Sequence, residues 1–198
     1  MTSLLIRLLA LAIVLIPGAA FAHTGHGDAS GIWHGFSHPV GGIDHVLAMV
    51  AVGILAYQLG GRALWLVPAT FVTVMALGGA LGMAGASLPY LEAGIALSVV
   101  ILGAVIALAI KTPVAAAMAM VGVFAIFHGF AHGAEMPANT SGAMYAAGFM
   151  LGTALLHISG LALGFLIGRI GEARGPLIVR GTGALTAIAG LLLLVNHL

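Results

Sequence analysis

Six long apolar stretches follow one another along the chain, and short polar or turn-forming breaks separate them. Each stretch is close to the ~20 residues that an α-helix needs to cross the hydrocarbon core of a bilayer. The breaks hold glycine, proline and charged residues, which are typical of turns between helices. The pattern predicts six membrane-spanning helices, at residues 42–60, 63–84, 91–110, 114–133, 143–168 and 177–195.

The composition excludes several classes of protein. Of 198 residues, 62% are hydrophobic, and the chain has only 6 Lys and Arg and 5 Asp and Glu. A soluble globular domain has about 25% charged residues, so that class is excluded. So few basic residues exclude a nucleic-acid-binding surface, and the lack of cysteine excludes disulfides and thiolate metal sites. We therefore predict an all-α fold, a polytopic membrane protein built as a six-transmembrane-helix bundle.

A further apolar segment precedes these six stretches. Residues 1–22 carry Arg7 near the start and end in Ala20-Phe21-Ala22. A short apolar run before such a small-residue pattern is typical of a signal peptide with its cleavage site. We predict that residues 1–22 are a cleavable signal peptide and that residues 23–198 form a single transmembrane domain. The alternative is an uncleaved first membrane helix, for which the apolar run is short.

The charged residues predict the orientation. With the N-terminus outside, the inner side holds all basic residues of the predicted mature chain: Arg62, Lys111, Arg169, Arg174 and Arg180. The outer side holds most of the acidic residues: Asp28, Asp44, Glu92 and Glu135. Basic residues concentrate on the cytoplasmic side of membrane proteins. We therefore predict a multi-pass protein of the bacterial inner membrane with its N-terminus outside.

Ionisable side chains are costly to bury in a membrane, so the places where they gather are candidate functional sites. The first such place is the start of the first predicted span, with His38, Asp44 and His45. Pro39 suits the first position of a helix and disfavours helical geometry at the residue before it. We therefore expect the helix to begin at Pro39 and His38 to lie just outside it.

The second place is the outer end of the fourth predicted span, with His128, His132 and Glu135. Their spacing of four and three residues puts them on one helix face. Two imidazoles and a carboxylate form half of a site suited to Ni, Co, Zn, Fe or Mn. Because the first and fourth spans run in opposite directions, both clusters lie at one depth. They form one metal site if the two helices are neighbours.

Both clusters lie within longer motifs that resemble those of the HupE/UreJ family. Residues 38–45 read HPVGGIDH, similar to the family signature HPxxGxDH. Residues 127–135 read FHGFAHGAE, similar to the family signature FHGxAHGxE. The resemblance implies a nickel or cobalt permease that supplies metal for hydrogenase or urease maturation. It also implies that six residues serve metal recognition or transport: His38, Asp44, His45, His128, His132 and Glu135.

From the residues and the resemblance together we predict a permease, and not an enzyme. It takes up a divalent transition-metal cation, Ni²⁺ or else Co²⁺, from the periplasm through the site between the first and fourth spans. We expect no bound cofactor and no catalytic residue. The expected partners are membrane lipid and the ion, with no nucleic acid, and a homo-oligomer stays open. The alternatives are a membrane-embedded metalloenzyme, a bis-His haem protein, or a metal-storing or sensing accessory protein.

Several other side chains have no assigned role at this point. His157, in the middle of the fifth span, is either a hydrogen-bonded structural residue or a ligand on the inward route. Met49 lies one turn below His45 and is a weak candidate ligand on the same route. The sequence leaves four further residues open: His23, His26, His34 and Glu92.

Overall fold

The computed structural model describes residues 28–197 of the chain. The predicted signal peptide and the tail residues His23 and His26 lie outside this part. Between residues 28 and 197 the chain forms seven helices and no strand. They are α2 (Asp28–Gly41), α3 (Ile43–Leu59), α4 (Ala63–Met83), α5 (Leu91–Ala107), α6 (Val114–Ala134), α7 (Gly142–Gly168) and α8 (Gly175–Val195).

Helices α3 to α8 coincide with the six predicted segments, because a continuous apolar run bounded by turn residues fixes where a membrane helix forms. Four of them, α4, α6, α7 and α8, are long and apolar enough to cross a membrane. Helices α2 and α3 together form a fifth candidate span, bent by 84° at its break, and α5 is shorter, with 17 residues. The all-helical, multi-pass architecture is therefore confirmed, while six crossings stay a prediction.

The largest departure from the predicted helices is α2. The expectation that a helix begins at Pro39, with His38 outside it, was wrong. Both residues lie in the last turns of α2, and the break falls at Gly42, whose backbone is extended with φ −99° and ψ 125°. A proline inside a helix removes one backbone hydrogen bond, and the glycines after it favour a helix poorly. The motif therefore ends one helix and begins another.

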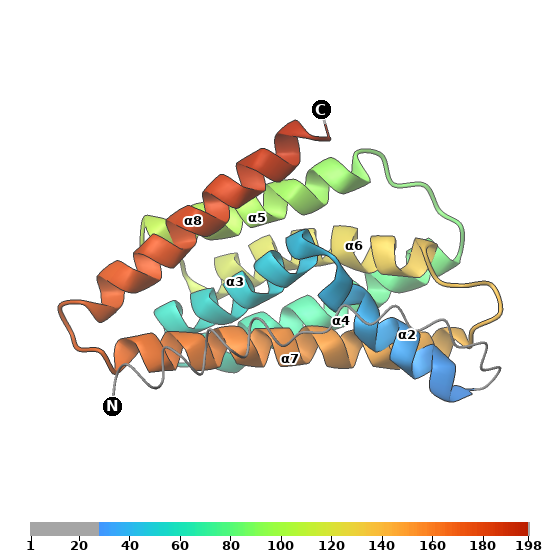
Figure 1. Ribbon diagram of the computed structural model, residues 1–198, viewed down its shortest axis with the longest axis horizontal. Coiled ribbons are helices and arrows are strands. Elements are labelled where there is room, and N and C mark those ends of the chain that lie inside the picture. The colour runs from blue at the N-terminus through green and yellow to red at the C-terminus, as the bar shows by residue number, and fades with distance from the viewer. Residues whose placement is uncertain (1–27, 198) are drawn as a thin grey trace.

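The two halves of this broken pair pack along α7, the longest helix (Figure 1). A Cβ on Gly35 of α2 would meet the carbonyl of Tyr145, and one on Gly53 of α3 would meet the carbonyl of His157. Small residues let helices approach closely in lipid, where no hydrophobic effect drives their association. Helix α2 therefore covers the first half of α7, and α3 covers the second half.

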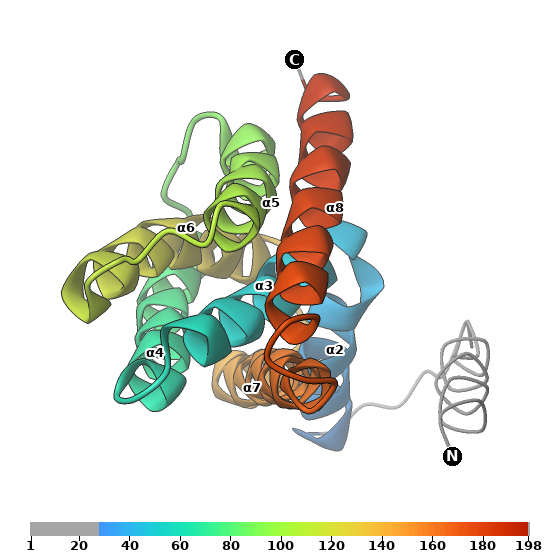
Figure 2. The ribbon, with the colours of Figure 1, turned by 90° about the vertical axis from the view of Figure 1, so that its left-hand side faces the viewer.

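Helix α3 occupies the centre of the bundle. Figure 2 shows it between the pair α4 and α6, the pair α5 and α8, and helix α7. Its residues from Ala48 to Ala56 are almost all buried, including Met49. Because α3 begins at the break, Asp44 and His45 lie partly buried at the outer end of this central helix.

The two ends of the molecule carry opposite charge. The α3–α4, α5–α6 and α7–α8 links lie toward the left-hand end in Figure 1 and contain Arg62, Lys111, Arg169 and Arg174. The starts of α5 and α7 and the end of α6 lie toward the other end. Asp44, Glu92 and Glu135 belong to the half of the molecule on that side. The candidate site opens on this acidic side.

Candidate metal site at the helix break

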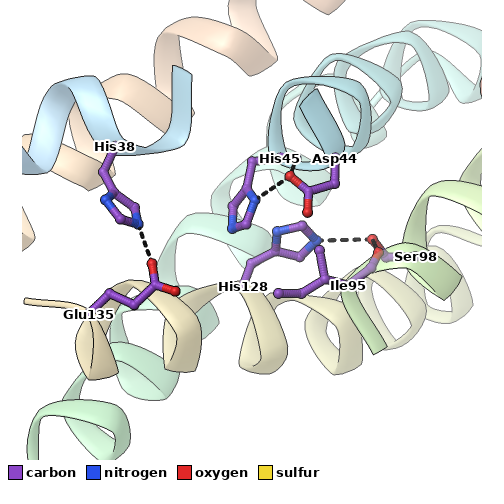
Figure 3. Close-up of polar contacts among 7 residues, drawn as sticks. All are labelled: His38, Asp44, His45, Ile95, Ser98, His128 and Glu135. Atoms are coloured by element: carbon purple, nitrogen blue, oxygen red, sulfur yellow. Dashed lines mark hydrogen bonds and ion pairs between the residues drawn. The ribbon is translucent and has the colours of Figure 1, made fainter. Parts of the chain in front are cut away.

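The two predicted clusters meet in the structure. His38 comes from the end of α2, Asp44 and His45 from the first turn of α3, and His128 from α6 (Figure 3). The sequence required the first and fourth predicted spans to be neighbours, and direct contacts between their histidine rings show that they are. Helix α2, which the sequence did not predict, brings in His38 from a third direction.

Four imidazoles form a continuous row of contacts, which we call the imidazole cluster: His38, His132, His45 and His128. Successive ring centroids are 4.9 Å apart for His38 and His132, 4.7 Å for His132 and His45, and 4.7 Å for His45 and His128. His128 and His132 are fully buried. The cluster thus concentrates nitrogen donors from three helices in a space closed to bulk solvent on its inner side.

Asp44 orients His45 within this cluster. Its Oδ1 lies 2.8 Å from His45 Nδ1 and also accepts the backbone N–H of His45 at 2.7 Å. An ionised carboxylate can only accept hydrogen bonds, so the ring proton lies on Nδ1 and Nε2 keeps its lone pair. That Nε2 is buried and has no hydrogen-bond partner within residues 28–197. A carboxylate that orients a histidine in this way is common behind metal ligands.

Ser98 of α5 does the same for His128 (Figure 3). The Ser98 Oγ lies 2.9 Å from His128 Nε2 and 2.6 Å from the carbonyl oxygen of Ile95. A serine has one hydroxyl proton, and the carbonyl can only accept, so Ser98 donates to Ile95 and His128 Nε2–H donates to Ser98. The Nδ1 of His128 therefore keeps its lone pair, and it is buried without a partner in the described part of the chain.

Ser98 is the residue that the sequence reasoning missed. It is a small hydroxyl in an otherwise apolar helix, outside both motifs, and only the packing of α5 against α6 gives it a partner. Local sequence offered no signal beyond a polar residue in a predicted span, because a serine there commonly bonds to its own helix backbone.

His132 and Glu135 occupy different environments although they are only three positions apart in the sequence. The His132 ring stacks on Phe149 with centroids 5.3 Å apart, and both of its ring nitrogens lack a partner among residues 28–197. Glu135 lies one residue beyond the end of α6, and its carboxylate reaches across to His38 Nε2 at 2.8 Å. Both members of this pair are partly exposed, so they form the outer rim of the site.

A cavity of about 360 Å³ opens beside this rim. Liquid water occupies about 30 Å³ per molecule, so the cavity has room for a cation together with its first hydration shell. Glu92 of α5, which the sequence left without a role, brings a third carboxylate to this space. The polar side chains that line the cavity are Ser37, His38, Asp44, His45, Glu92 and Glu135.

Comparison with known proteins identifies the family. The sequence profile described as "HupE / UreJ protein" matches residues 11–193 of the chain. The chain belongs to the HupE/UreJ family. It is 46% identical over 187 residues to "Protein HupE" of Rhizobium leguminosarum bv. viciae, an alignment that covers 94% of this chain and 95% of that protein. No solved structure matches the chain. The resemblance expected from the two motifs is thus confirmed.

In this HupE/UreJ protein the imidazole rings contact one another and not a common centre. Within residues 28–197, no three His, Asp or Glu side chains are arranged so that they could hold one metal ion as they stand. Coordination by three of them therefore requires at least one side chain to move. Of the residues left open, His34 is exposed on α2 and Met49 is buried in the core of α3.

Proposed function

We propose that this HupE/UreJ protein is a permease that carries a divalent transition-metal cation, Ni²⁺ or Co²⁺, from the periplasm to the cytoplasm. The observation that carries the proposal is the imidazole cluster at the helix break. Four of its buried ring nitrogens, on His45, His128 and His132, lack hydrogen-bond partners in the described structure, and it adjoins a cavity lined by three carboxylates. Buried polar groups in native structures are normally paired, so unpaired nitrogens in such a cluster support a ligand.

The distribution of charge supports the proposed orientation. The basic links lie at the end opposite the cavity, and basic residues concentrate on the cytoplasmic side of membrane proteins. The cavity then faces the periplasm of a protein of the inner membrane.

The helices allow six membrane crossings if the broken pair α2–α3 counts as one span and α5 as another. At 1.5 Å per residue the 17 residues of α5 are about 26 Å long, near the thickness of the hydrocarbon core.

The order of donors along the site supports entry followed by dehydration. Asp44, Glu92 and Glu135 give the cavity a negative field that attracts cations. Next inward are the neutral imidazoles, which bind Ni²⁺ and Co²⁺ in preference to the oxygen-seeking Mg²⁺ and Ca²⁺. Asp44 and Ser98 fix the tautomers of His45 and His128 before the ion arrives, which lowers the cost of the movement that coordination requires.

The membrane potential favours inward movement of a cation. An inside-negative potential of 100 mV is worth about 2.3 kcal/mol for each charge, and thus about 4.6 kcal/mol for a divalent cation.

The spacing of the histidine rings argues against the haem alternative. Ring centroids 4.7 Å apart leave no gap in which a haem could lie between these histidines, so the contacts favour an ion. Delivery of the metal to hydrogenase or urease maturation rests on the family resemblance alone.

The test is metal influx into proteoliposomes that hold the purified full-length protein and an inside-negative diffusion potential. We expect saturable influx of Ni²⁺ or Co²⁺ that exceeds influx of Zn²⁺ and Mn²⁺, and loss of influx in His132→Ala. The control is His197→Ala, because His197 is exposed beyond the end of α8. Metal binding without influx would contradict a permease and favour a storage or sensing protein.

A further inference from the structure

A buried stripe of α7 continues inward from the imidazole cluster. Its members recur every four residues and so lie on one face of the helix. Each is at most 1% exposed. Two of them contact the cluster: the Tyr145 ring lies 6.2 Å from the ring of His38, and Phe149 stacks on His132. From the outer to the inner end the stripe consists of Tyr145, Phe149, Thr153 and His157.

His157 at the inner end is the unexplained member of the stripe. It is 1% exposed, and neither of its ring nitrogens has a hydrogen-bond partner in the part of the chain that the structure describes. The structural interpretation of this residue required a backbone carbonyl or hydroxyl as partner, and none is within reach among residues 28–197. An unpaired polar group at such a position calls for a bound water or ion.

Side chains of α4 and α7 surround His157 on the side of the cluster. The Phe71 ring of α4 lies 5.1 Å from the His157 ring and 5.6 Å from the His128 ring, so one aromatic ring contacts both imidazoles. One turn outward, the Thr153 hydroxyl donates to Met75 Sδ at 3.5 Å. One turn outward of His157 the structure therefore places a hydroxyl and a thioether, both uncharged.

Two helices give the same depth for His157. On α7 it lies eight residues inward of Phe149, which is about 12 Å at 1.5 Å per residue. On α3 its carbonyl faces Gly53, which lies eight residues inward of His45. His157 is thus about two helical turns inward of His45 and His132, and near the middle of α7.

We propose that His157 is the principal ligand of a second, inner metal-binding site, which receives the divalent transition-metal cation from the imidazole cluster. The inference rests on the proposed transport function and extends it inward. Helices α4 and α7 contain no Asp or Glu, so the inner site has a neutral imidazole with the hydroxyl and thioether beside it. It binds more weakly than the cluster, which suits an ion that must leave again toward the cytoplasm.

The test uses the full-length protein with His157→Leu and His157→Gln, and His197→Gln as the matched control. Leucine fills the space with apolar atoms, and glutamine keeps hydrogen-bonding capacity without an imidazole. We expect Ni²⁺ influx into proteoliposomes to fall at least tenfold in both variants, while equilibrium Ni²⁺ affinity in detergent stays within twofold. Thermal unfolding of the leucine variant should not begin at a lower temperature, because it removes unpaired buried nitrogens.

Three results would overturn the inner site, and they are distinguishable. Influx at the unmodified rate in both variants would show that the ion does not need His157. Loss of Ni²⁺ affinity together with influx would place His157 within the first site or its support. Absence of influx by the unmodified protein would contradict the proposed transport function itself.

Discussion

The helix break and the α5–α8 pair both pack through glycine, but only the helix break forms a candidate site. In both regions glycine allows backbones to approach closely: Gly35 meets α7, and Gly103 meets the backbone of α8 at Ala187. The α5–α8 pair is regular, and α8 turns residues such as Leu185 and Leu192 outward. At the break, by contrast, a proline and two glycines accompany the interruption of the helix, and partly buried ionisable groups gather beside it. Packing alone therefore needs regular helices, whereas the candidate site needs an interruption.

The largest expected effect that separates the two regions is on metal affinity. His132→Ala removes a buried donor, so Ni²⁺ affinity should fall by more than the ~10–100-fold that is typical of residues that only orient a ligand. Leu192→Ala, on the exposed face of α8, should leave affinity unchanged. Isothermal titration of the detergent-solubilised protein measures both. Equal affinity in the two variants would remove the distinction between the regions.

Removal of an orienting residue should have a smaller effect. Ser98→Ala deprives His128 Nε2–H of its acceptor and frees the ring to change tautomer, so Ni²⁺ affinity should fall by roughly 10–100-fold. Ser98→Thr retains the hydroxyl and should keep most of the affinity. If alanine and threonine behave alike in a titration, the hydrogen bond to His128 does not orient the ligand.

Acidification should weaken binding at the break and leave the α5–α8 pair intact. Protons compete with the metal for imidazole nitrogens, so Ni²⁺ affinity should fall by roughly tenfold or more between pH 7 and pH 5. Helix α8 contains no histidine, Asp or Glu, and the one acidic residue of α5, Glu92, lines the cavity, so the contact between the two helices has no titrating group in this range. Titrations at several pH values, with circular dichroism at each, measure the two effects. Constant affinity across the range would contradict imidazole ligands.

The smallest expected functional effect comes from the α5–α8 pair. Gly103→Ala puts a methyl group against the backbone of α8, and overpacking of this kind costs typically about 1–3 kcal/mol of stability. Gly181→Ala, in open space on α8, should be neutral or slightly stabilising. Thermal unfolding in detergent compares the two variants. Ni²⁺ affinity of the folded protein should not change in either, and a loss in Gly103→Ala would link this pair to the site.

The same contrast explains how much could be predicted from the sequence. The positions of α3 to α8 follow from apolar runs, because membrane thickness sets helix length whatever the neighbours are. Helix α2 was missed because Pro39 before two glycines fits a helix start as well as a helix end. Only the packing of the upstream residues against α7 decides between these readings.

The sequence brought the six candidate residues together, but it did not give the contacts between them. Spacing and motif gathered the six candidate residues, and the structure places them around one helix break. Which side chain pairs with which depends on contacts between helices. Sequence alone therefore could not give the Glu135 bond to His38 or the Ser98 bond to His128, whose partners are 97 and 30 residues apart.

X-ray absorption at the nickel K edge of the Ni²⁺-loaded protein tests the central claim most directly, since it reports the atoms bound to the ion. The account predicts scattering from at least two imidazole rings, with one fewer in His132→Ala and no change in His197→Ala. A first shell of oxygen atoms alone, without the multiple scattering of imidazole, would contradict it. The ion would then bind the carboxylates of the cavity and not the histidines of the helix break.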